Sequence, residues 1–518
     1  MKRYLLLLAG LLYGCSLQAQ WSLETTRCLG GTLNDGIYRL LSLPDNGVLA
    51  AGFTFSSIGG HHGSCDGWVI RTDSTLNTVW ERAMGGSGNE QFFDIIAQDS
   101  NFIICGVAGS NNGNVSGLQG MDDGWLIKLR DDGTTVWKKC FGGTQADGFR
   151  SVIQTTDGGY LLCGYTFSND GDVTGYHGPA NNWADAWIVK TDAQRNILWQ
   201  RCWGGSDADA AYAAVLLPTQ EIIVACMSNS VDGDIDTTNG NRDIWLLKFD
   251  NNGTLLRQQN FGGSFDEEPR GLLLAPNGRL VVGGFSFSDD GNLTGNYFNG
   301  TTNWEDGWVF ETDTAFHLIR QKNIGGTGSD VINRIYASAN GYLAVAESNS
   351  ADYDRTGNSF GFKDAWLVHL DTSFQIVSQQ SVGGSFNDFA FDVQTDLAGR
   401  LVMAGFTASS NLCGLGNSDG MLLRFINQTT TGVDFASSIN TENNCYYSSE
   451  RHAIVFTRPA SSANTVNVFS SDGKLVFSGI VPGESQFFKL PPLTDGIYIV
   501  TLAEKEKTMR LKIFCETR

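Results

Sequence analysis

The sequence predicts an all-β protein: a seven-bladed β-propeller closed by its N-terminal strand, followed by a small C-terminal β-sandwich. Three observations support this prediction. Two short motifs recur in fixed order along residues 20–426. Each repeat contains four short segments with the composition of β-strands. One extra strand-like segment precedes the first repeat, and the last repeat lacks one.

The first motif is a Gly-Gly pair followed by Ser or Thr, with an acidic residue three positions after the hydroxyl residue. The pairs begin at Gly30, Gly85, Gly142, Gly204, Gly262, Gly325 and Gly383. The acids are Asp35, Glu90, Asp147, Asp209, Glu267, Asp330 and Asp388. The second motif, Asp-x-Trp, begins at Asp66, Asp123, Asp185, Asp243, Asp306 and Asp364, and its seventh copy has Asp419 with Met421 in the Trp place. Seven copies at spacings of 55–63 residues indicate a repeat architecture.

Each repeat is expected to contain four strands. In the third repeat these are residues 148–155, 160–167, 186–190 and 197–202, which are short, apolar or alternating, and separated by Gly, Asp and Asn. A four-stranded unit that repeats at this length favours a propeller blade. An open solenoid is the alternative.

The ends of the repeat array predict how the ring closes. Residues 21–29 match the fourth strand of a repeat, and no first three strands precede them. The seventh repeat supplies three strands, which end near Phe425, and no fourth. Joining the two fragments completes a seventh blade and removes open sheet edges.

The N-terminus has the pattern of an export signal over residues 1–19. A basic start is followed by an apolar run of about ten residues and a small-residue exit, which is too short for a permanent membrane helix. We expect cleavage after Ala19; a lipoprotein-type cleavage before Cys15 is the alternative. No later segment is long and apolar enough to act as an anchor, so we expect a secreted or outer cell-surface protein.

The composition excludes some partners. The formal net charge is −20, from 35 Lys and Arg against 55 Asp and Glu. Nucleic acids and anionic membranes both require a basic face on the protein. We therefore expect no nucleic-acid partner and no transmembrane segment.

The C-terminus reads as a separate unit. Residues 427–446 form a polar linker, and residues 447–518 contain a hairpin with Asp472 and Gly473 in its turn, a strand over residues 493–502 that includes Gly496, Ile497 and Tyr498, and a last strand, "MRLKIF". These elements resemble the C-terminal sorting domain of type IX secretion cargo (T9SS type A) in Bacteroidota. The resemblance implies a Gram-negative source and the type IX secretion machinery as a partner.

The repeats themselves resemble SBBP repeats, which form seven-bladed propellers. The segments "CGYTFSNDGDVTGYHG", "DAWIVKTDA" and "WQRCWGGSDAD" carry this resemblance, which covers residues 21–426. It implies a propeller in a surface or extracellular setting and no particular chemistry.

Both repeated motifs are expected to be structural. Gly tolerates positive φ, and the hydroxyl and carboxylate groups can accept or donate hydrogen bonds where the chain crosses between blades. The Trp of Asp-x-Trp is expected to fill the gap between neighbouring blades.

The loop between the second and third strands suggests Ca²⁺ in several repeats. Oxygen-bearing side chains at positions 1, 3 and 5 copy the first half of a calcium loop, although Asx-turns use the same residues. The candidate ligands are Asp170, Asp172 and Thr174 in repeat three, Asp232, Asp234, Asp236 and Asp243 in repeat four, and Asp352, Asp354 and Thr356 in repeat six.

Two of these loops are longer and carry aromatic residues that are candidates for ligand binding, for example to sugar rings. Local packing of a longer loop is the alternative. The candidates are Tyr176, His177 and Trp183 in repeat three, and Tyr297, Phe298 and Trp304 in repeat five.

The 11 Cys residues support two candidate disulfides, Cys65 with Cys413 and Cys445 with Cys515. The first pair occupies corresponding loops of repeats one and seven, and the second brackets the C-terminal unit. Cysteines at equivalent repeat positions, such as Cys28, Cys140 and Cys202, are expected to be small buried hydrophobic residues.

No catalytic signature is present, and none of the six His residues belongs to a metal-binding motif. The sequence therefore favours a secreted binding or scaffold module for a surface glycan or protein. Two alternatives stay open: a secreted polysaccharide-active hydrolase or lyase, because carboxylates are plentiful, and a purely structural envelope component.

Overall fold

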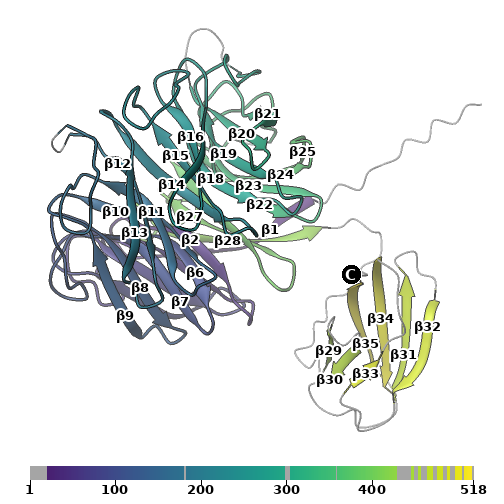
Figure 1. The fold of residues 1–518 in the computed structure, drawn as a ribbon. Coiled ribbons are helices and arrows are strands. Elements are labelled where there is room, and N and C mark those ends of the chain that lie inside the picture. The colour runs from purple at the N-terminus through teal and green to yellow at the C-terminus, as the bar shows by residue number, and fades with distance from the viewer. Residues whose placement is uncertain are drawn as a thin grey trace, which may run out of the picture. The chain divides into compact units, whose positions relative to one another are not determined.

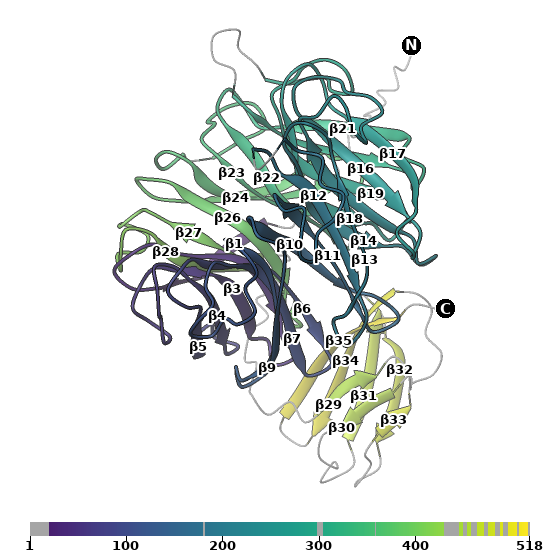
Figure 2. The same ribbon diagram turned by 60° about the vertical axis from the view of Figure 1, so that its left-hand side comes forward.

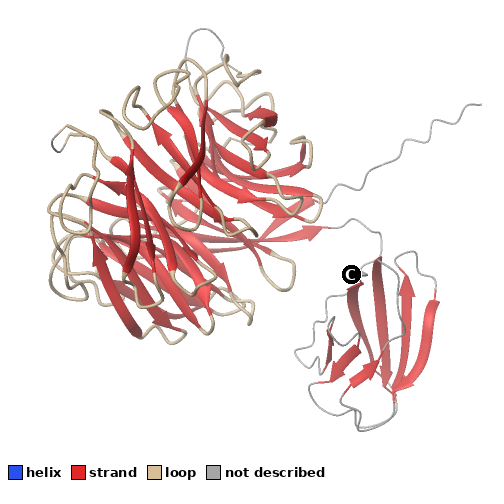
Figure 3. Cartoon of the chain, viewed as in Figure 1, coloured by secondary structure: helices blue, strands red, loops and turns tan. Residues whose placement is uncertain are grey.

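The structure is a computed structural model that describes residues 20–179, 182–297, 304–357 and 359–428, together with the strands of the C-terminal unit. The chain divides into two compact units, Met1–Thr430 and Thr431–Arg518. The described residues form strands, turns and loops without a helix (Figure 3). None of them therefore belongs to a helix long and apolar enough to cross a membrane. The predicted signal peptide, residues 1–19, lies outside the described residues.

The first unit contains seven antiparallel four-stranded sheets (Figures 1 and 2). Blade one is β2 (Asp35–Ser42), β3 (Val48–Thr54), β4 (Asp66–Thr72) and β5 (Thr78–Met84). Blade two is β6 (Glu90–Gln98), β7 (Asn101–Ala108), β8 (Asp123–Arg130) and β9 (Thr135–Phe141). Blade three is β10 (Asp147–Gln154), β11 (Tyr160–Thr166), β12 (Asp185–Thr191) and β13 (Ile197–Trp203).

The next three blades repeat this order. Blade four is β14 (Asp209–Leu216), β15 (Ile222–Ser228), β16 (Asp243–Phe249) and β17 (Leu255–Phe261). Blade five is β18 (Glu267–Leu274), β19 (Leu280–Ser286), β20 (Asp306–Thr312) and β21 (Leu318–Ile324). Blade six is β22 (Asp330–Ser338), β23 (Gly341–Ser348), β24 (Asp364–Asp371) and β25 (Ile376–Val382).

The seventh blade joins the two ends of the unit, as the sequence predicts. It contains β26 (Asp388–Thr395), β27 (Leu401–Thr407), β28 (Asp419–Gln428) and, as its outermost strand, β1 (Gln20–Leu29). β1 pairs antiparallel with β28 from Gln20 opposite Gln428 to Leu29 opposite Gly420. Each innermost strand contacts the innermost strands of both neighbouring blades, and β2 contacts β26. The unit is therefore a closed seven-bladed β-propeller.

Apolar packing between blades holds the ring together. Every side chain of β3 is buried because both faces of the sheet are covered by neighbouring blades. The Trp of Asp-x-Trp fills the gap between blades: Trp125 is fully buried, stacks on Phe92 with ring centroids 5.3 Å apart, and packs against Leu49 and Val69 of blade one. The interpretation of this Trp as a structural residue is thus correct.

The Gly-Gly motif is also structural, as expected. In blade one the buried carboxylate of Asp35 accepts hydrogen bonds from Gly31 N at 2.7 Å, Thr54 Oγ1 at 2.5 Å and Ser56 Oγ at 2.8 Å. The acids of the other six blades accept the equivalent backbone bond from the second Gly of their own motif. One carboxylate per blade therefore fixes the turn where the chain enters the innermost strand.

In blades two to five this acid lies close to the Asp of the Asp-x-Trp motif of the preceding blade. A Cβ atom added at Gly142 would lie 2.6 Å from both Asp123 Oδ1 and Asp147 Oδ2. Asp123 Oδ1 is buried and has no hydrogen-bond partner among the described residues. Burial, reinforced by the nearby Asp147 charge, raises the pKa of Asp123 to about 7. A protonated Asp123 is the form that this close pair of carboxyl groups favours.

The C-terminal unit contains two antiparallel sheets. The first has the order β29 (Cys445–Ser448), β30 (Ala453–Phe456), β33 (Phe487–Lys489). The second has the order β32 (Leu475–Val481), β31 (Asn464–Ser470), β34 (Gly496–Glu504), β35 (Lys507–Cys515). The predicted hairpin is present as the β31–β32 pair.

Several C-terminal predictions concern residues that the structure does not describe. Asp472 and Gly473 of the hairpin turn, and residues 429–444 of the predicted linker, lie outside the described residues. Gly496, Ile497 and Tyr498 lie in β34, which is present but begins three residues after the predicted start of this strand. The side chains of Cys445 and Cys515 also lie outside the described part, so their disulfide stays a prediction.

Candidate functional site

One face of the propeller carries both the Gly-Gly turns and the loops that join the second and third strands of each blade. We call it the loop face. Hydrogen bonds join the two kinds of segment within a blade: Asp170 on the loop of blade three accepts from the backbone and hydroxyl of Thr144, on the turn that enters this blade, at 2.7 and 2.8 Å. The described residues among the proposed calcium ligands and ligand-binding residues lie on or next to this face.

In blade three, the candidate calcium ligands bond to protein donors. Asp172 Oδ2 accepts from Gly142 N at 3.3 Å and from Gln119 Nε2 at 2.7 Å. Thr174 accepts from Gln200 Nε2 through both its hydroxyl and its carbonyl. The oxygen atoms of this loop thus accept hydrogen bonds that hold the loop against the neighbouring turn and strand.

Blade four has the same arrangement. Asp232 Oδ1 accepts from Ser206 N at 2.7 Å, and Asp234 Oδ2 accepts from Gly204 N at 3.4 Å. Asp243 is buried at the start of β16 and accepts from Asn239 N at 2.6 Å, while Asp236 is exposed.

In blade six, Asp352 accepts from Thr327 N and Oγ1 at 2.8 and 2.9 Å. Asp354 accepts from Tyr297 Oη at 2.8 Å, and its carboxylate lies 3.5 Å from Lys322 Nζ. Thr356 donates its N–H to Gln379 Oε1 at 3.1 Å.

These residues, as placed, do not fit a calcium site, because their oxygen atoms accept from separate N–H and O–H donors. Calcium requires six to eight oxygen ligands around one point. Among the residues that the structure describes, no group of three or more His, Cys, Asp and Glu side chains is arranged to hold a metal ion. Calcium binding by these loops stays a prediction, which the melting experiment in the Discussion tests.

The structure does bring three of the predicted residues to one groove. A cavity of about 510 Å³ between blades three and four is lined by Thr174, His177 and Asp234, with Cys202 and Trp203 on β13. The His177 ring lies between two carboxylates, with Nδ1 2.9 Å from Asp185 Oδ2 and Nε2 3.6 Å from Asp234 Oδ2. Burial raises the pKa of both Asp185 and Asp234.

The predicted aromatic residues divide into packed and exposed ones. Tyr176 donates its hydroxyl to the Trp183 carbonyl at 2.5 Å, while the Trp183 side chain is 49% exposed. Tyr297 stacks on Tyr353 with ring centroids 4.7 Å apart. Trp304 is 48% exposed, and Phe298 lies outside the described residues.

Exposed apolar residues gather on the loop face beyond those that the sequence suggested. Several occupy the variable position of the Gly-Gly-Ser/Thr-x turn, where the residue type changes from blade to blade. Phe362 and Phe386 stack with centroids 6.3 Å apart. The exposed apolar side chains of this face are Leu33, Met121, Trp183, Val231, Phe265, Trp304, Tyr353, Phe360, Phe362, Phe386 and Leu415.

Comparison with known proteins finds only distant similarities. No protein-family model and no curated protein matches the chain. Solved structures similar to it include the Pan2 WD40 domain of Neurospora crassa, 8% identical over 79% of this chain and 96% of that chain, with a TM-score of 0.42. A DUF4221 family member of Bacteroides vulgatus is 10% identical over 80% and 99% of the two chains, with a TM-score of 0.36. Plexin A of Drosophila, in complex with Semaphorin 1b, is 8% identical over 78% and 88%, with a TM-score of 0.40.

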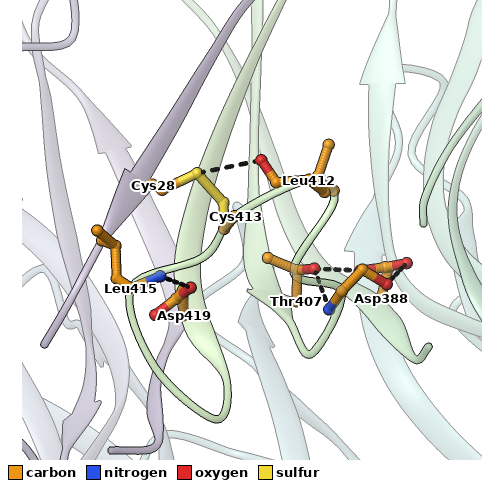
Figure 4. Close-up of a disulfide and its surroundings, with 8 residues drawn as sticks. Cys28, Asp388, Thr407, Leu412, Cys413, Leu415 and Asp419 are labelled. Carbon is orange, nitrogen blue, oxygen red and sulfur yellow. Dashed lines mark hydrogen bonds between the residues drawn. A yellow bond between two sulfur atoms is a disulfide. The ribbon is translucent and has the colours of Figure 1, made fainter. Parts of the chain in front are cut away.

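The predicted Cys65–Cys413 disulfide is wrong, because Cys413 pairs with Cys28 (Figure 4). Cys65 precedes β4 and is buried as a free thiol. Its backbone forms an isolated β-bridge with Asn89, on the turn that enters blade two. It therefore faces blade two, away from blade seven. Cys28 lies on β1, beside the loop of its own blade that contains Cys413. The expectation that Cys28 is a small buried hydrophobic residue is therefore also wrong. The other cysteines at repeated positions, Cys105, Cys140, Cys163 and Cys202, are buried and free, as expected.

The position of Cys28 in its repeat explains the observed pair. Cys28 occupies the same repeat position as Cys140, whose thiol contacts the Ser116 carbonyl on the loop of its own blade at 3.6 Å. A cysteine at this position therefore lies beside the loop between the second and third strands of its own blade. For Cys28, the closure prediction makes that loop the one before β28.

Proposed function

We propose that the protein is an exported cell-surface binding module whose propeller contacts a glycan or protein through the loop face, and whose C-terminal unit directs it through the type IX secretion system. The observation that carries the proposal is the set of eleven exposed apolar side chains on that face. Large exposed aromatic residues on loops are characteristic of contact surfaces. The resemblance to SBBP repeats and the export signal support the extracellular setting.

The binding role is tested with the mature chain, residues 20–518, in which Trp183, Trp304 and Phe362 are changed to Ser. The labelled protein is applied to a polysaccharide microarray and to outer-membrane vesicles from a Bacteroidota bacterium. We expect the triple variant to lose at least tenfold in binding while keeping its melting temperature, because these side chains support no core.

A matched control changes exposed apolar residues away from the loop face. Val79, Leu198 and Leu256 lie on the outermost strands and are 60%, 54% and 50% exposed. Their change to Ser should leave binding intact. Equal loss in both triple variants, or no binding to either surface by the unaltered chain, would contradict the proposed role of this face and favour a purely structural envelope component.

The secretion role is tested separately by expressing the chain without residues 431–518 in a type IX-competent host. We expect the shortened chain to accumulate in the periplasm and the full chain to reach the surface or medium. A strain that lacks the type IX machinery should retain the full chain as well. Surface delivery of the shortened chain would contradict the assignment of the C-terminal unit.

The alternative function is a secreted polysaccharide-active enzyme. The groove between blades three and four favours it, because His177 lies between two carboxylates in a cavity large enough for a sugar ring. The test is release of reducing ends, and of unsaturated products for a lyase, from purified polysaccharides. Turnover that disappears in His177→Asn would replace the binding function with a catalytic one.

A further inference from the structure

Every blade carries a β-bulge in its innermost strand, at the third residue after the buried acid of the Gly-Gly motif. In blade one the pairing of β2 with β3 skips Tyr38, and the same skip occurs in β6, β10, β14, β18, β22 and β26. A bulge re-aims the side chain of the extra residue. The seven bulged residues line one cavity of about 340 Å³, which lies on the propeller axis because all seven blades contribute to it.

The bulged residues divide the cavity into two sides. Blades seven, one and two, which are consecutive in the ring, supply Phe391, Tyr38 and Phe93. Tyr38 lies 5.2 Å from Phe391 and 5.5 Å from Phe93 between ring centroids, so these rings form a continuous aromatic wall.

Blades three to six supply the opposite side with Arg150, Tyr212, Arg270 and Asn333. The Arg150 guanidinium lies 4.5 Å from the Tyr212 ring centroid, which fixes its position. No Asp or Glu lines the cavity, although the chain as a whole has a net charge of −20. The axial cavity thus has an aromatic side and a cationic side.

Two of the four arginines in this cavity are neutralised by carboxylates. Arg39 is buried, with Nη2 2.8 Å from Asp94 Oδ1 and Nη1 3.9 Å from Asp392 Oδ2. Arg270 Nη2 lies 2.9 Å from Glu268 Oε1.

The other two, Arg150 and Arg334, form no ion pair among the described residues. The Nε atoms of Arg150 and Arg270 are buried and have no hydrogen-bond partner. A partly buried guanidinium without an acceptor is unfavourable, because it has lost hydration without gaining a counter-charge. Unpaired N–H donors on one side of the cavity therefore point to an anion that accepts from them.

We infer that the axial cavity is a binding site for a small organic carboxylate that carries an aromatic ring. The carboxylate would accept from Arg150, Arg270 and Arg334, whose planar guanidinium groups match its geometry. The ring would pack against Tyr38, Phe93 and Phe391. The cavity volume is at the lower end of the range for small-molecule sites, which favours a ligand of one or two rings over a polymer.

The test compares charged and neutral probes of the same shape on the unaltered mature chain, residues 20–518. Benzoate, phenylacetate and indole-3-acetate are each titrated by calorimetry beside their uncharged amides, with inorganic phosphate as a further probe. We expect at least one carboxylate to bind with an affinity at least tenfold higher than that of its amide and of phosphate. Equal binding of acid and amide, equal binding of phosphate, or no binding by any carboxylate would overturn the inference.

Variants then locate the site. Arg150→Met keeps the length of the side chain and removes its charge, and we expect at least tenfold weaker binding of the carboxylate. Arg82→Met is the matched control, because Arg82 is an exposed arginine whose guanidinium also lies over an aromatic ring, 5.7 Å from Trp80. Unchanged carboxylate affinity in Arg150→Met would place the site elsewhere. If Arg150→Met does not fold, the carboxylate affinity of Arg334→Met locates the site instead, and the probe comparison on the unaltered chain still tests the inference.

Discussion

Cys28 and Cys413 are joined by a disulfide that connects a strand and a loop from opposite ends of the propeller sequence, 385 residues apart, with Cα atoms 5.6 Å from each other (Figure 4). The bond lies in the one blade whose strands come from both ends of the unit. It fixes β1 to the loop before β28, so closure of the ring depends on backbone pairing and on a covalent link.

Loss of this disulfide should destabilise the propeller. We expect Cys28→Ser with Cys413→Ser to lower the free energy of unfolding by about 2–4 kcal/mol, because the bond restricts the unfolded chain over a long loop. The measurement is denaturant unfolding of the mature chain under oxidising conditions.

The control for the disulfide is Cys140→Ser, at the equivalent position of blade two, where the thiol is free and buried. The unaltered chain should lose stability on reduction, and the double variant should not respond to the reductant. Equal stability of the double variant and the unaltered chain would show that β-pairing alone closes the ring.

The paired buried carboxyl groups predict that stability falls as the pH rises. Burial raises the pKa of Asp123 and Glu267 to about 7 and that of Asp209 to about 6. The folded protein therefore holds more protons than the unfolded chain between about pH 4 and pH 7, and stability decreases with pH in that window. Thermal melts from pH 4.5 to pH 8.5 should show a falling melting temperature.

Asp123→Asn tests the origin of this dependence. An amide mimics the protonated carboxyl and can donate to Asp147, so we expect the variant to gain on the order of 1 kcal/mol at pH 8 and little at pH 4.5. Asp99→Asn, at an exposed turn, is the control and should change neither value. A gain that is the same at both pH values would show that Asp123 is not protonated in the folded protein.

The calcium hypothesis and the hydrogen-bonded loops lead to opposite results in one experiment. Because the carboxylates of Asp170, Asp232 and Asp352 already accept from backbone N–H groups, we expect the same melting temperature with excess Ca²⁺ and with chelator. A rise of several degrees with Ca²⁺, lost when Asp232, Asp234 and Asp236 are changed to Ala, would establish that these loops bind calcium.

Gly171 should be intolerant of a side chain. Its φ is 63°, and an added Cβ would lie 2.5 Å from the Gly142 carbonyl oxygen on the neighbouring turn. We expect Gly171→Ala to destabilise by about 2–3 kcal/mol, from backbone strain together with the separation of loop and turn. Gly278→Ala, at φ 78° with no atom within 4 Å of the added Cβ, isolates the strain and should cost about 1 kcal/mol. Equal costs would mean that the close approach contributes nothing.

The sequence predicted most of the fold because the same motifs and strand-like segments occur seven times. The four strands of blade three were placed within two residues of their observed bounds, and the pairing of residues 21–29 with the seventh repeat is correct. In the sequence, the position three residues after each acid differs between repeats: it holds Arg150 and Arg270 in two repeats and an aromatic residue in others. Its role was not predicted, because strand alternation does not reveal a bulge.

The sequence by itself determined the number of blades, the strand order and the closure, because these follow from local periodicity and from complementary ends. Only the tertiary structure decided which cysteines meet, which loop oxygens accept hydrogen bonds, and that Arg150 and Arg334 share one cavity without carboxylate partners. These relationships join residues that are distant in sequence. They depend on the ring bringing seven innermost strands to one axis and on the bulges that turn their side chains toward it.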